Sequence, residues 1–238
     1  MSNESVSTFF NAWEVYDQVL DNDYMFHDEV HRDLQAFLAE NFSQQPFSVL
    51  DLGCGSARHM AATLCKFRPD LVVGYDISSV ALEYADKELA ATGAEVRVCE
   101  GDLLEALTLE EKPFDLIFAG YALHHLESLK KQRFFKLASK LLTPSGVLVV
   151  LDMVRESDEE REAFLSGYCQ WVADDWNELS DVAVTGIREH VMSSDYPETY
   201  DDLAAMADTA GLNKTQRISC YGCHQLLAFR SPTLESGV

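Results

Sequence analysis

The chain has 238 residues, 47% hydrophobic and 24% charged, which predicts one globular domain with a sizeable core. Its 18 Lys and Arg against 40 Asp and Glu give a formal net charge of -22, and such a surface repels phosphate backbones and anionic lipid headgroups. We therefore expect no nucleic-acid or membrane partner. A cationic partner and a merely solvated acidic surface both fit the charge.

Neither the start of the chain nor its cysteines indicate export. Residues 1–10 show no basic flank before an apolar stretch, and no apolar run reaches the length of a membrane-spanning helix. Six cysteines are too few for a disulfide framework in a chain of this length, so reduced thiols are predicted. We expect a soluble, unexported, cytoplasmic protein.

The first part of the chain predicts two helices that precede the core. Apolar residues recur at helical spacing over residues 10–38, with a break at residues 21–23. A short apolar strand follows at 48–52 and ends in a glycine turn, after which a helix is predicted over 58–67.

Strands and helices then alternate. The predicted elements are strand 72–75, helix 79–91, strand 95–100, a short helical or loop stretch, strand 114–119, helix 129–142, a turn at 143–146 and strand 147–153. Five apolar strands interleaved with helices predict an α/β fold with a parallel sheet that is covered on both faces.

The pattern changes after residue 153. Residues 155–179 are very acidic and carry apolar positions at helical spacing, which predicts an amphipathic cover with a charged outer face. A helix is predicted over 201–210. Two further strands, at 214–221 and 223–229, are joined tightly at Gly222 as an antiparallel hairpin.

Three segments at the ends of predicted strands point to a ligand. The glycines of the turn Gly53-Cys54-Gly55, after Asp51, allow the backbone to approach a nucleotide-like molecule closely. Asp76 follows the second strand, where it would bind ribose hydroxyls or cap the next helix. Asp102 follows the third strand and would accept from an adenine amine or serve as a turn residue.

In this order, the segments resemble the class I S-adenosylmethionine-dependent methyltransferases, over about residues 47–230. The family motif is an acidic residue followed by Gly-x-Gly-x-Gly, and here it reads Asp51, Gly53, Gly55 with Ala57 at the third glycine. The resemblance implies a doubly wound, mostly parallel seven-stranded sheet with a C-terminal antiparallel hairpin, helices on both faces and N-terminal helices.

The resemblance also implies S-adenosyl-L-methionine as cofactor and S-adenosyl-L-homocysteine as product. By position it assigns the amino group of the cofactor to Asp51 and the backbone at Ala119 and Gly120, and the methionine part to Gly53 and Gly55. The ribose would bind Asp76, and the adenine would contact Ile77, Asp102 and Leu103. Tyr16 or Met25 would form a lid over the cofactor. The single domain would divide into an N-terminal helical lid (1–46), a cofactor core (47–154), an acidic substrate-side cover (155–200) and a C-terminal helix and hairpin (201–232).

Methyl transfer from a sulfonium needs alignment rather than a metal or a covalent intermediate, so no metal site is predicted. The acceptor is expected to be a small molecule that presents a nitrogen, an oxygen or a carboxylate. His124, His125 and Tyr121 follow the fourth strand and are candidates for a catalytic base. The same histidines could instead only organise the loop.

The cover offers two opposite predictions for the substrate's charge. Its aromatic residues would either cage a cation or pack the cover onto the sheet; they are Tyr168, Trp171, Trp176 and Tyr196. Arg188 and His190 would suit a carboxylate instead.

Other functions are weighed against the same residues. The glycine motif of dinucleotide-dependent oxidoreductases requires a third glycine at the position of Arg58, which disfavours that class of enzyme. A non-catalytic S-adenosylmethionine-binding partner would share the glycine turn. Cys220-Tyr221-Gly222-Cys223-His224 matches haem-attachment spacing, but it straddles the predicted hairpin and lacks a second cysteine pair for zinc.

Overall fold

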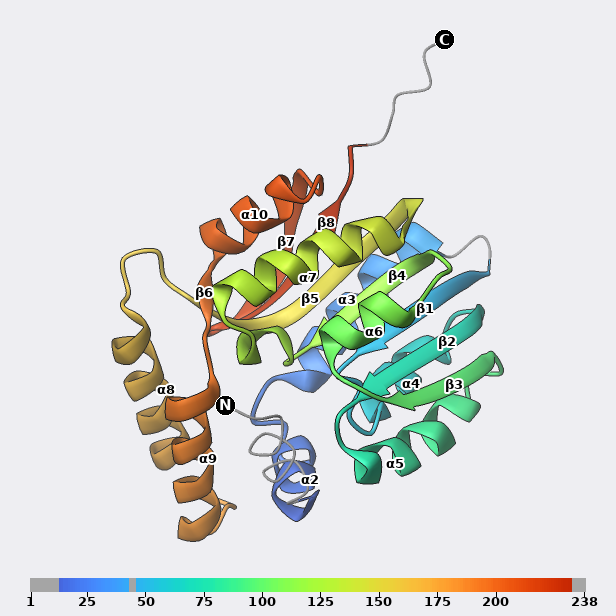
Figure 1. Cartoon of the computed structure of the whole chain (residues 1–238). Coiled ribbons are helices and arrows are strands. Elements are labelled where there is room, and N and C mark those ends of the chain that lie inside the picture. The colour runs from blue at the N-terminus through green and yellow to red at the C-terminus, as the bar shows by residue number, and fades with distance from the viewer. Residues whose placement is uncertain (1–12, 43–45, 233–238) are drawn as a thin grey trace.

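The structure of the protein is a computed structural model that describes residues 13–42 and 46–232 (Figure 1). The predicted first helix began at residue 10, and residues 10–12 lie outside the described part. Within the described ranges, no helix combines the length and the apolar character that crossing a membrane requires.

One mostly parallel sheet forms the centre of the molecule. Its strand order is β3-β2-β1-β4-β5-β8-β7, and β8 runs antiparallel to both of its neighbours. The strands are β1 (Phe47–Leu52), β2 (Pro69–Asp76), β3 (Glu95–Glu100), β4 (Phe114–Gly120), β5 (Leu142–Arg155), β7 (Lys214–Tyr221) and β8 (His224–Arg230), and the short β6 (Glu198–Thr199) pairs with the end of β5. The predicted seven-stranded sheet and its antiparallel hairpin are confirmed.

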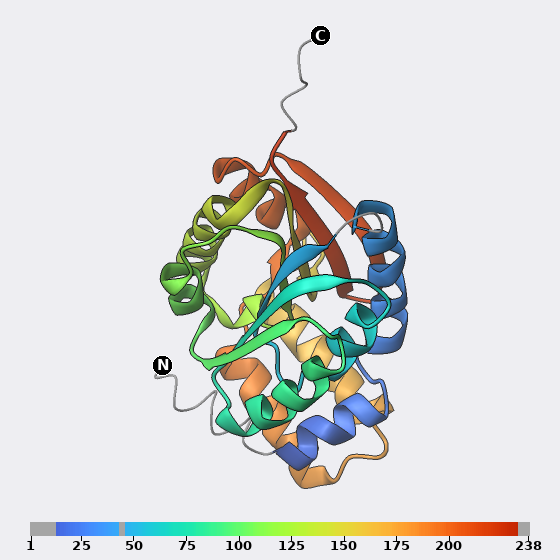
Figure 2. The same cartoon turned by 90° about the vertical axis from the view of Figure 1, so that its right-hand side faces the viewer.

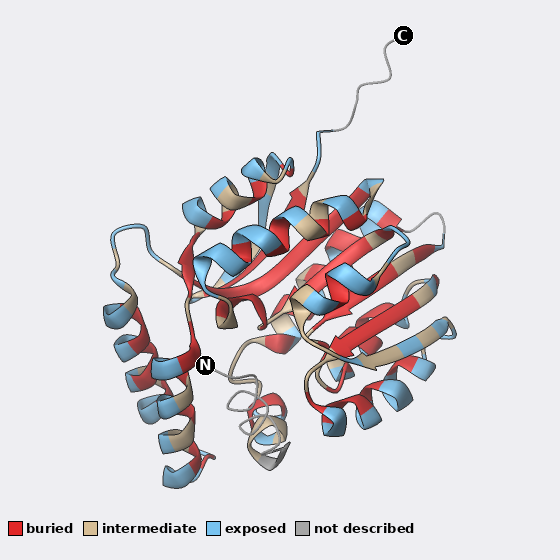
Figure 3. Cartoon of the chain, viewed as in Figure 1, coloured by how far each residue is buried: buried red, intermediate tan, exposed pale blue. Residues whose placement is uncertain are grey.

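Helices cover both faces of the sheet because successive strand residues point to opposite sides. Val49 of β1 packs under α3 (His27–Phe42), α4 (Arg58–Leu64) and α5 (Ser79–Ala90). Its neighbour Leu50 packs under α6 (Leu103–Leu109), α7 (Ser128–Leu141) and α10 (Tyr200–Thr209). Figure 3 shows the central strands as a buried layer between helices whose outer faces are exposed, while the edge strand β3 is partly exposed. The doubly wound architecture is therefore confirmed.

A third apolar cluster lies beyond the carboxyl ends of the strands. It joins α2 (Trp13–Asp21), α8 (Arg161–Asp175) and α9 (Asp181–Ser194), with Val19, Leu165 and Ile187 among its buried members. Figures 1 and 2 both place these helices together at the lower end of the molecule. Of the two N-terminal helices, which are separated at residues 22–26, α2 thus meets the acidic cover, whereas α3 packs on the sheet.

Two predictions for the chain after α7 are wrong. The turn expected at residues 143–146 belongs to β5: Phe114 pairs with Leu142 and Leu116 with Val147, so β5 accommodates extra residues within a continuous strand. The cover contains a second helix, α9, where none was predicted. Its signal was present, because Ala183, Ile187 and Val191 are buried at four-residue spacing.

Candidate active site

A cavity of about 340 Å³ lies at the carboxyl ends of β1, β2 and β4. Its floor includes the glycine turn after β1 and the loops after β2 and β3. Its other walls come from α2, the 3₁₀ turn η1 (Leu123–His125), α8 and α9. Ligands of open α/β sheets bind in such a crevice at the strand ends.

The glycine turn adopts a backbone that favours glycine. Gly53 and Gly55 have φ angles of 73° and 52°, and the Gly53 amide donates to the Tyr75 carbonyl at 2.8 Å. A methyl group added at Gly55 would come within 2.7 Å of the Tyr16 hydroxyl oxygen. Tyr16, the predicted lid residue, therefore lies directly over the turn, and Ala57 keeps a left-handed backbone with φ 56°.

Asp76 holds the glycine turn against β2. One carboxylate oxygen accepts from the Gly55 amide at 2.8 Å, and the other accepts from the Ser78 amide at 2.8 Å. The capping role considered for Asp76 is wrong, because the N-cap of α5 is Ser78, whose hydroxyl accepts from the Ala81 amide. Asp76 lines the cavity, as expected of a ribose-binding residue.

A second carboxylate lies next to Asp76. Asp51 at the end of β1 is 2% exposed and also lines the cavity. Burial, and then the charge of Asp76, raises the pKa of Asp51 to about 8. Burial also raises the pKa of Asp76, although its backbone hydrogen bonds oppose that shift. A cation bound here would be stabilised by both groups.

The loop after β3 behaves as a helix start. Asp102 caps α6 by accepting from the Leu104 and Glu105 amides, each at 2.8 Å. Leu103 and Ile77 line the cavity together with Asp102. At the end of β4, Gly120 lines the cavity, whereas Ala119 is fully buried in the core beneath it.

The two adjacent histidines of η1 are bound to different carboxylates. His124 is paired through Nδ1 with Asp152, which also accepts from the His124 amide at 2.8 Å. His125 Nδ1 lies 2.9 Å from Asp195 Oδ1. Burial lowers the pKa of His124, but Asp152 and Asp195 overcome it and leave the pKa raised. Burial and His124 lower the pKa of His125.

Tyr121 connects the acceptor side of the cavity to the N-terminal helices. Its hydroxyl donates to the Met25 carbonyl, and burial raises its pKa well above the usual value. Tyr121 and Met25 both line the cavity. The phenol is therefore a neutral hydrogen-bond donor that closes the junction between α2 and α3.

Sequence reasoning missed half of the histidines at this site, namely His27, His31 and His59. Six of the seven histidines of the chain line the cavity: His27, His31, His59, His124, His125 and His190. They come from α3, α4, η1 and α9, so no local motif joins them. Asp152 and Asp195 were missed for the same reason.

The two substrate predictions for the cover have different outcomes. The aromatic residues pack against one another: Trp171 lies 5.4 Å from the Tyr168 ring and 5.5 Å from the Trp176 ring. Tyr168, Trp171 and Trp176 therefore help to pack the cover, while Tyr168, Trp176 and Tyr196 also line the cavity, so the cage for a cation stays a prediction. Arg188 is exposed and does not line the cavity. Of the two residues predicted to bind a carboxylate of the substrate, only His190 therefore reaches the cavity.

The fold and the glycine turn define a class of transferase. A family model described as a methyltransferase domain matches residues 49–146, from β1 into β5. Together with the relatives and the shared fold, this match supports a class I S-adenosylmethionine-dependent methyltransferase. Members of this family use S-adenosylmethionine as methyl donor and release S-adenosylhomocysteine.

Individual relatives cover most of the chain. An uncharacterized methyltransferase of Bacillus licheniformis is 28% identical over 166 residues, which are 69% of this chain and 73% of that protein. A carboxy-S-adenosyl-L-methionine synthase of Pectobacterium atrosepticum is 27% identical over 203 residues, 82% of this chain and 79% of the relative. The solved YcgJ protein from Bacillus subtilis shares the fold, with a TM-score of 0.58 at 19% identity over 79% of this chain and 71% of its own.

Proposed function

We propose that the chain transfers the methyl group of S-adenosylmethionine to a nitrogen, an oxygen or a carboxylate of a small molecule by in-line displacement. The cofactor would occupy the part of the cavity at the ends of β1 and β2. Its proposed contacts are Tyr16, Asp51, Gly53, Gly55, Asp76, Ile77, Asp102, Leu103 and the backbone at Ala119 and Gly120.

The buried carboxyl of Asp51 beside the half-buried carboxyl of Asp76 carries the cofactor proposal. Two carboxyl groups buried beside one another are unfavourable when both are ionised. The amino acid part of S-adenosylmethionine brings an ammonium group and a sulfonium, and these positive charges would offset the repulsion. Tyr16 over Gly55 supports a lid on the methionine part.

The position of η1 supports an acceptor on the opposite side of the same cavity. His124, His125 and Tyr121 line it, and α8 and α9 cover it. A covered cavity favours a small acceptor and excludes water from the reacting atoms. The net charge of -22 argues against a nucleic acid in this role. These groups favour an enzyme over a protein that only binds the cofactor.

Among these three side chains, His125 is the best proton acceptor. The Tyr121 hydroxyl already donates a hydrogen bond to the Met25 carbonyl. His124 is paired with Asp152, which raises the pKa of the His124 imidazole. The lowered pKa of His125 keeps its imidazole neutral near pH 7. If the acceptor carries a proton, His125→Ala should therefore reduce turnover at saturating cofactor by about 10²–10⁴-fold.

Calorimetry with S-adenosylmethionine, S-adenosylhomocysteine and NAD tests the cofactor site. We expect both sulfur compounds to bind and NAD not to bind. Asp76→Ala should weaken binding by about 1–3 kcal/mol, because buried hydrogen bonds to the ribose and to Gly55 are lost. Asp86→Ala, on the exposed face of α5, is the matched control.

Failure of the wild-type protein to bind either sulfur compound would overturn the proposal. Equal affinities of the wild-type and Asp76→Ala proteins would remove Asp76 from the cofactor site. Because one relative is a carboxy-S-adenosyl-L-methionine synthase, native mass spectrometry of the purified protein should also determine the mass of any sulfur compound that it retains.

A further inference from the structure

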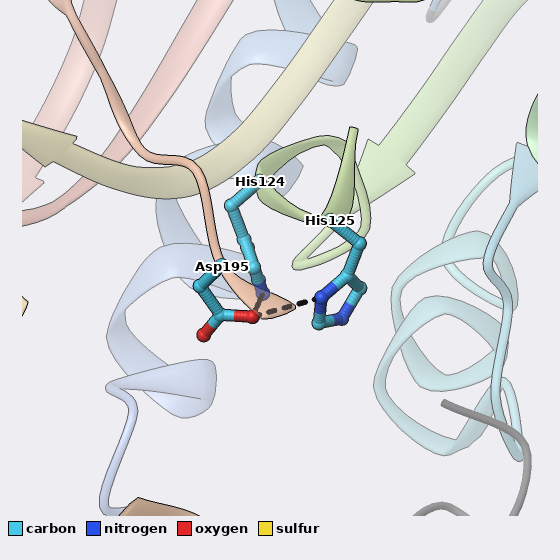
Figure 4. A group of neighbouring side chains, drawn as sticks. All are labelled: His124, His125 and Asp195. Carbon is cyan, nitrogen blue, oxygen red and sulfur yellow. Dashed lines mark hydrogen bonds and ion pairs between the residues drawn. The ribbon is translucent and has the colours of Figure 1, made fainter. Parts of the chain in front are cut away.

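Three imidazoles surround one buried carboxylate at the acceptor end of the cavity. Asp195 Oδ1 lies 2.9 Å from His125 Nδ1, 3.8 Å from His124 Nε2 and 3.7 Å from His190 Nε2. Asp195 is 2% exposed and all three histidines line the cavity. Figure 4 shows the rings of His124 and His125 approaching the same Asp195 oxygen.

Two of these distances are too long for hydrogen bonds. An N–H donor lies within about 3.2 Å of its acceptor oxygen, whereas His124 and His190 stand clearly farther from Asp195. Ligand atoms that share one ion at about 2.0–2.2 Å stand roughly 3–4 Å from one another. The spacing around Asp195 is thus closer to that of ligands around an ion.

The surroundings fix each member in place. Asp152 holds His124 through Nδ1, which turns Nε2 toward Asp195. A carboxylate behind a histidine orients it in the same way in known metal sites. The segment of Asp195 is anchored as well, because Arg161 donates to the Asp195 carbonyl at 2.8 Å and the His124 carbonyl accepts from the Tyr196 amide at 2.7 Å.

We propose that His124, His125, His190 and Asp195 bind one divalent transition-metal ion. Within the described residues, His124, His125 and Asp195 form the one group of three or more potential ligands whose atoms lie within 4.8 Å of one another. His190 of α9 lies outside that group, and we add it to the proposed ligands because its Nε2 is 3.7 Å from Asp195 Oδ1. No spacing motif joins the four residues, so the sequence carries no local signal for this site.

The donor set indicates the class of ion. Three imidazole nitrogens and one carboxylate oxygen suit zinc, cobalt, nickel or iron(II), whereas magnesium and calcium prefer oxygen ligands. The ion would face the cavity and could coordinate a nitrogen, a hydroxyl or a carboxylate of the methyl acceptor. With the ion bound, His125 would serve as a ligand in place of its role as proton acceptor. This role rests on the proposed function, but metal binding itself does not.

Titration of the metal-free, cofactor-free protein with Co²⁺ tests the site. Calorimetry gives the stoichiometry, and the visible d–d absorption of Co²⁺ reports nitrogen ligands. We expect one Co²⁺ per chain. His125→Gln, His190→Gln and Asp195→Asn should each weaken binding at least about tenfold, since even partners behind the ligands contribute about 10–100-fold. His59→Gln, a cavity histidine outside the cluster, should bind Co²⁺ as the wild type does.

Absence of stoichiometric Co²⁺ binding by the wild-type protein would overturn the proposal. So would equal losses in His59→Gln and in the cluster variants, or unchanged affinity in His125→Gln and His190→Gln. Binding of S-adenosylhomocysteine, measured on every variant without metal, serves as the check for folding. Loss of Co²⁺ binding with retained S-adenosylhomocysteine binding contradicts only the metal site, and the reverse contradicts only the cofactor site.

Discussion

At the scale of single residues, the site is dominated by ionisable groups that the fold removes from water. Asp51 carries a pKa of about 8 beside Asp76, and His190 carries one of about 4 beside Asp195. Both shifts begin with burial, which disfavours the charged form of acids and bases alike. Ligand binding and acidity should therefore be coupled at defined residues.

Asp51 predicts a pH-dependent affinity for the cofactor. Below pH 8 the free protein holds a proton on Asp51, and a bound ammonium group favours its release. Affinity for S-adenosylhomocysteine should rise with pH, by at most tenfold per unit, and level off above about pH 8. Calorimetry from pH 6 to 8.5 in two buffers of different ionisation enthalpy measures the released proton.

The matched variant for this test is Asp51→Asn, which cannot titrate. It should bind more weakly and without the rise in affinity. A wild-type affinity that stays constant over the whole range would show that Asp51 does not change its protonation on binding.

His224 predicts an acid-sensitive stability. It is 1% exposed, no described residue hydrogen-bonds either ring nitrogen, and burial lowers its pKa to about 4. Between pH 6.5 and 4 the unfolded chain binds a proton on His224 that the native protein does not bind. The free energy of unfolding therefore decreases as the pH is lowered through this range. His224→Phe should stabilise the protein by about 1–3 kcal/mol, because an unpaired buried polar ring is removed.

The advantage of His224→Phe should grow by up to about 1.4 kcal/mol per pH unit as pH falls from 6.5 to 4. Urea unfolding at several pH values measures it. His224→Gln separates the two effects, since it abolishes titration but keeps a polar group. A constant difference between the wild-type and Phe proteins would contradict the assigned pKa.

At the scale of elements, strands and their glycine turns follow from the sequence better than the cover does. β3 and β7 have their predicted bounds, because each of these partly exposed edge strands ends at a turn glycine, Gly101 and Gly222 respectively. The α9 helix was not predicted, although Ser180 caps it through the Ala183 amide. Its apolar stripe is narrow, and the polar residues that it carries to the cavity obscure the pattern.

The candidate site likewise contains a part that could be predicted from the sequence and a part that could not. Asp51, Gly53, Gly55 and Asp76 line the cavity as predicted, since one sheet edge collects residues that follow its strands. The cluster around Asp195 could not be predicted, because its members are brought together only by the packing of α9 on η1. Contacts between distant segments leave no local spacing.

Replacing glycine by alanine should have opposite effects on stability in the turn of the β7–β8 hairpin and in α8. Gly222 has a φ of 58° and open space around it, so Gly222→Ala should destabilise by about 1–2 kcal/mol through backbone strain alone. Gly167 lies in α8 with equally open space, and Gly167→Ala should stabilise by about 0.5–1 kcal/mol. Denaturant unfolding of both variants measures the pair, and equal signs would contradict the assigned turn geometry.

At the scale of the whole molecule, the cavity lies where three apolar clusters meet. The two faces of the sheet are packed by separate sets of helices, and α2, α8 and α9 form the third set around Val19 and Ile187. A ligand in the cavity contacts the sheet edge and the third cluster together. Binding should therefore stabilise the fold as a unit.

Thermal unfolding with S-adenosylhomocysteine measures this effect. At a ligand concentration of about 100 times Kd, stability should rise by about 2.7 kcal/mol. For a protein of this size, that corresponds to a midpoint shift of about 5–10 °C. Asp76→Ala should show a smaller shift at the same concentration. A midpoint that does not move at saturation would contradict binding to the native state.

The concentration of histidines in the cavity also makes the protein a convenient spectroscopic object. Each imidazole carries two carbon-bound protons with distinct nuclear magnetic resonance signals, so seven rings give a small and assignable set. Six rings line the cavity, and His224 lies outside it among the rings of Phe26, Tyr168 and Trp171. Candidate acceptors could thus be screened by the ring signals that move, and the largest shifts are expected for the six rings that line the cavity.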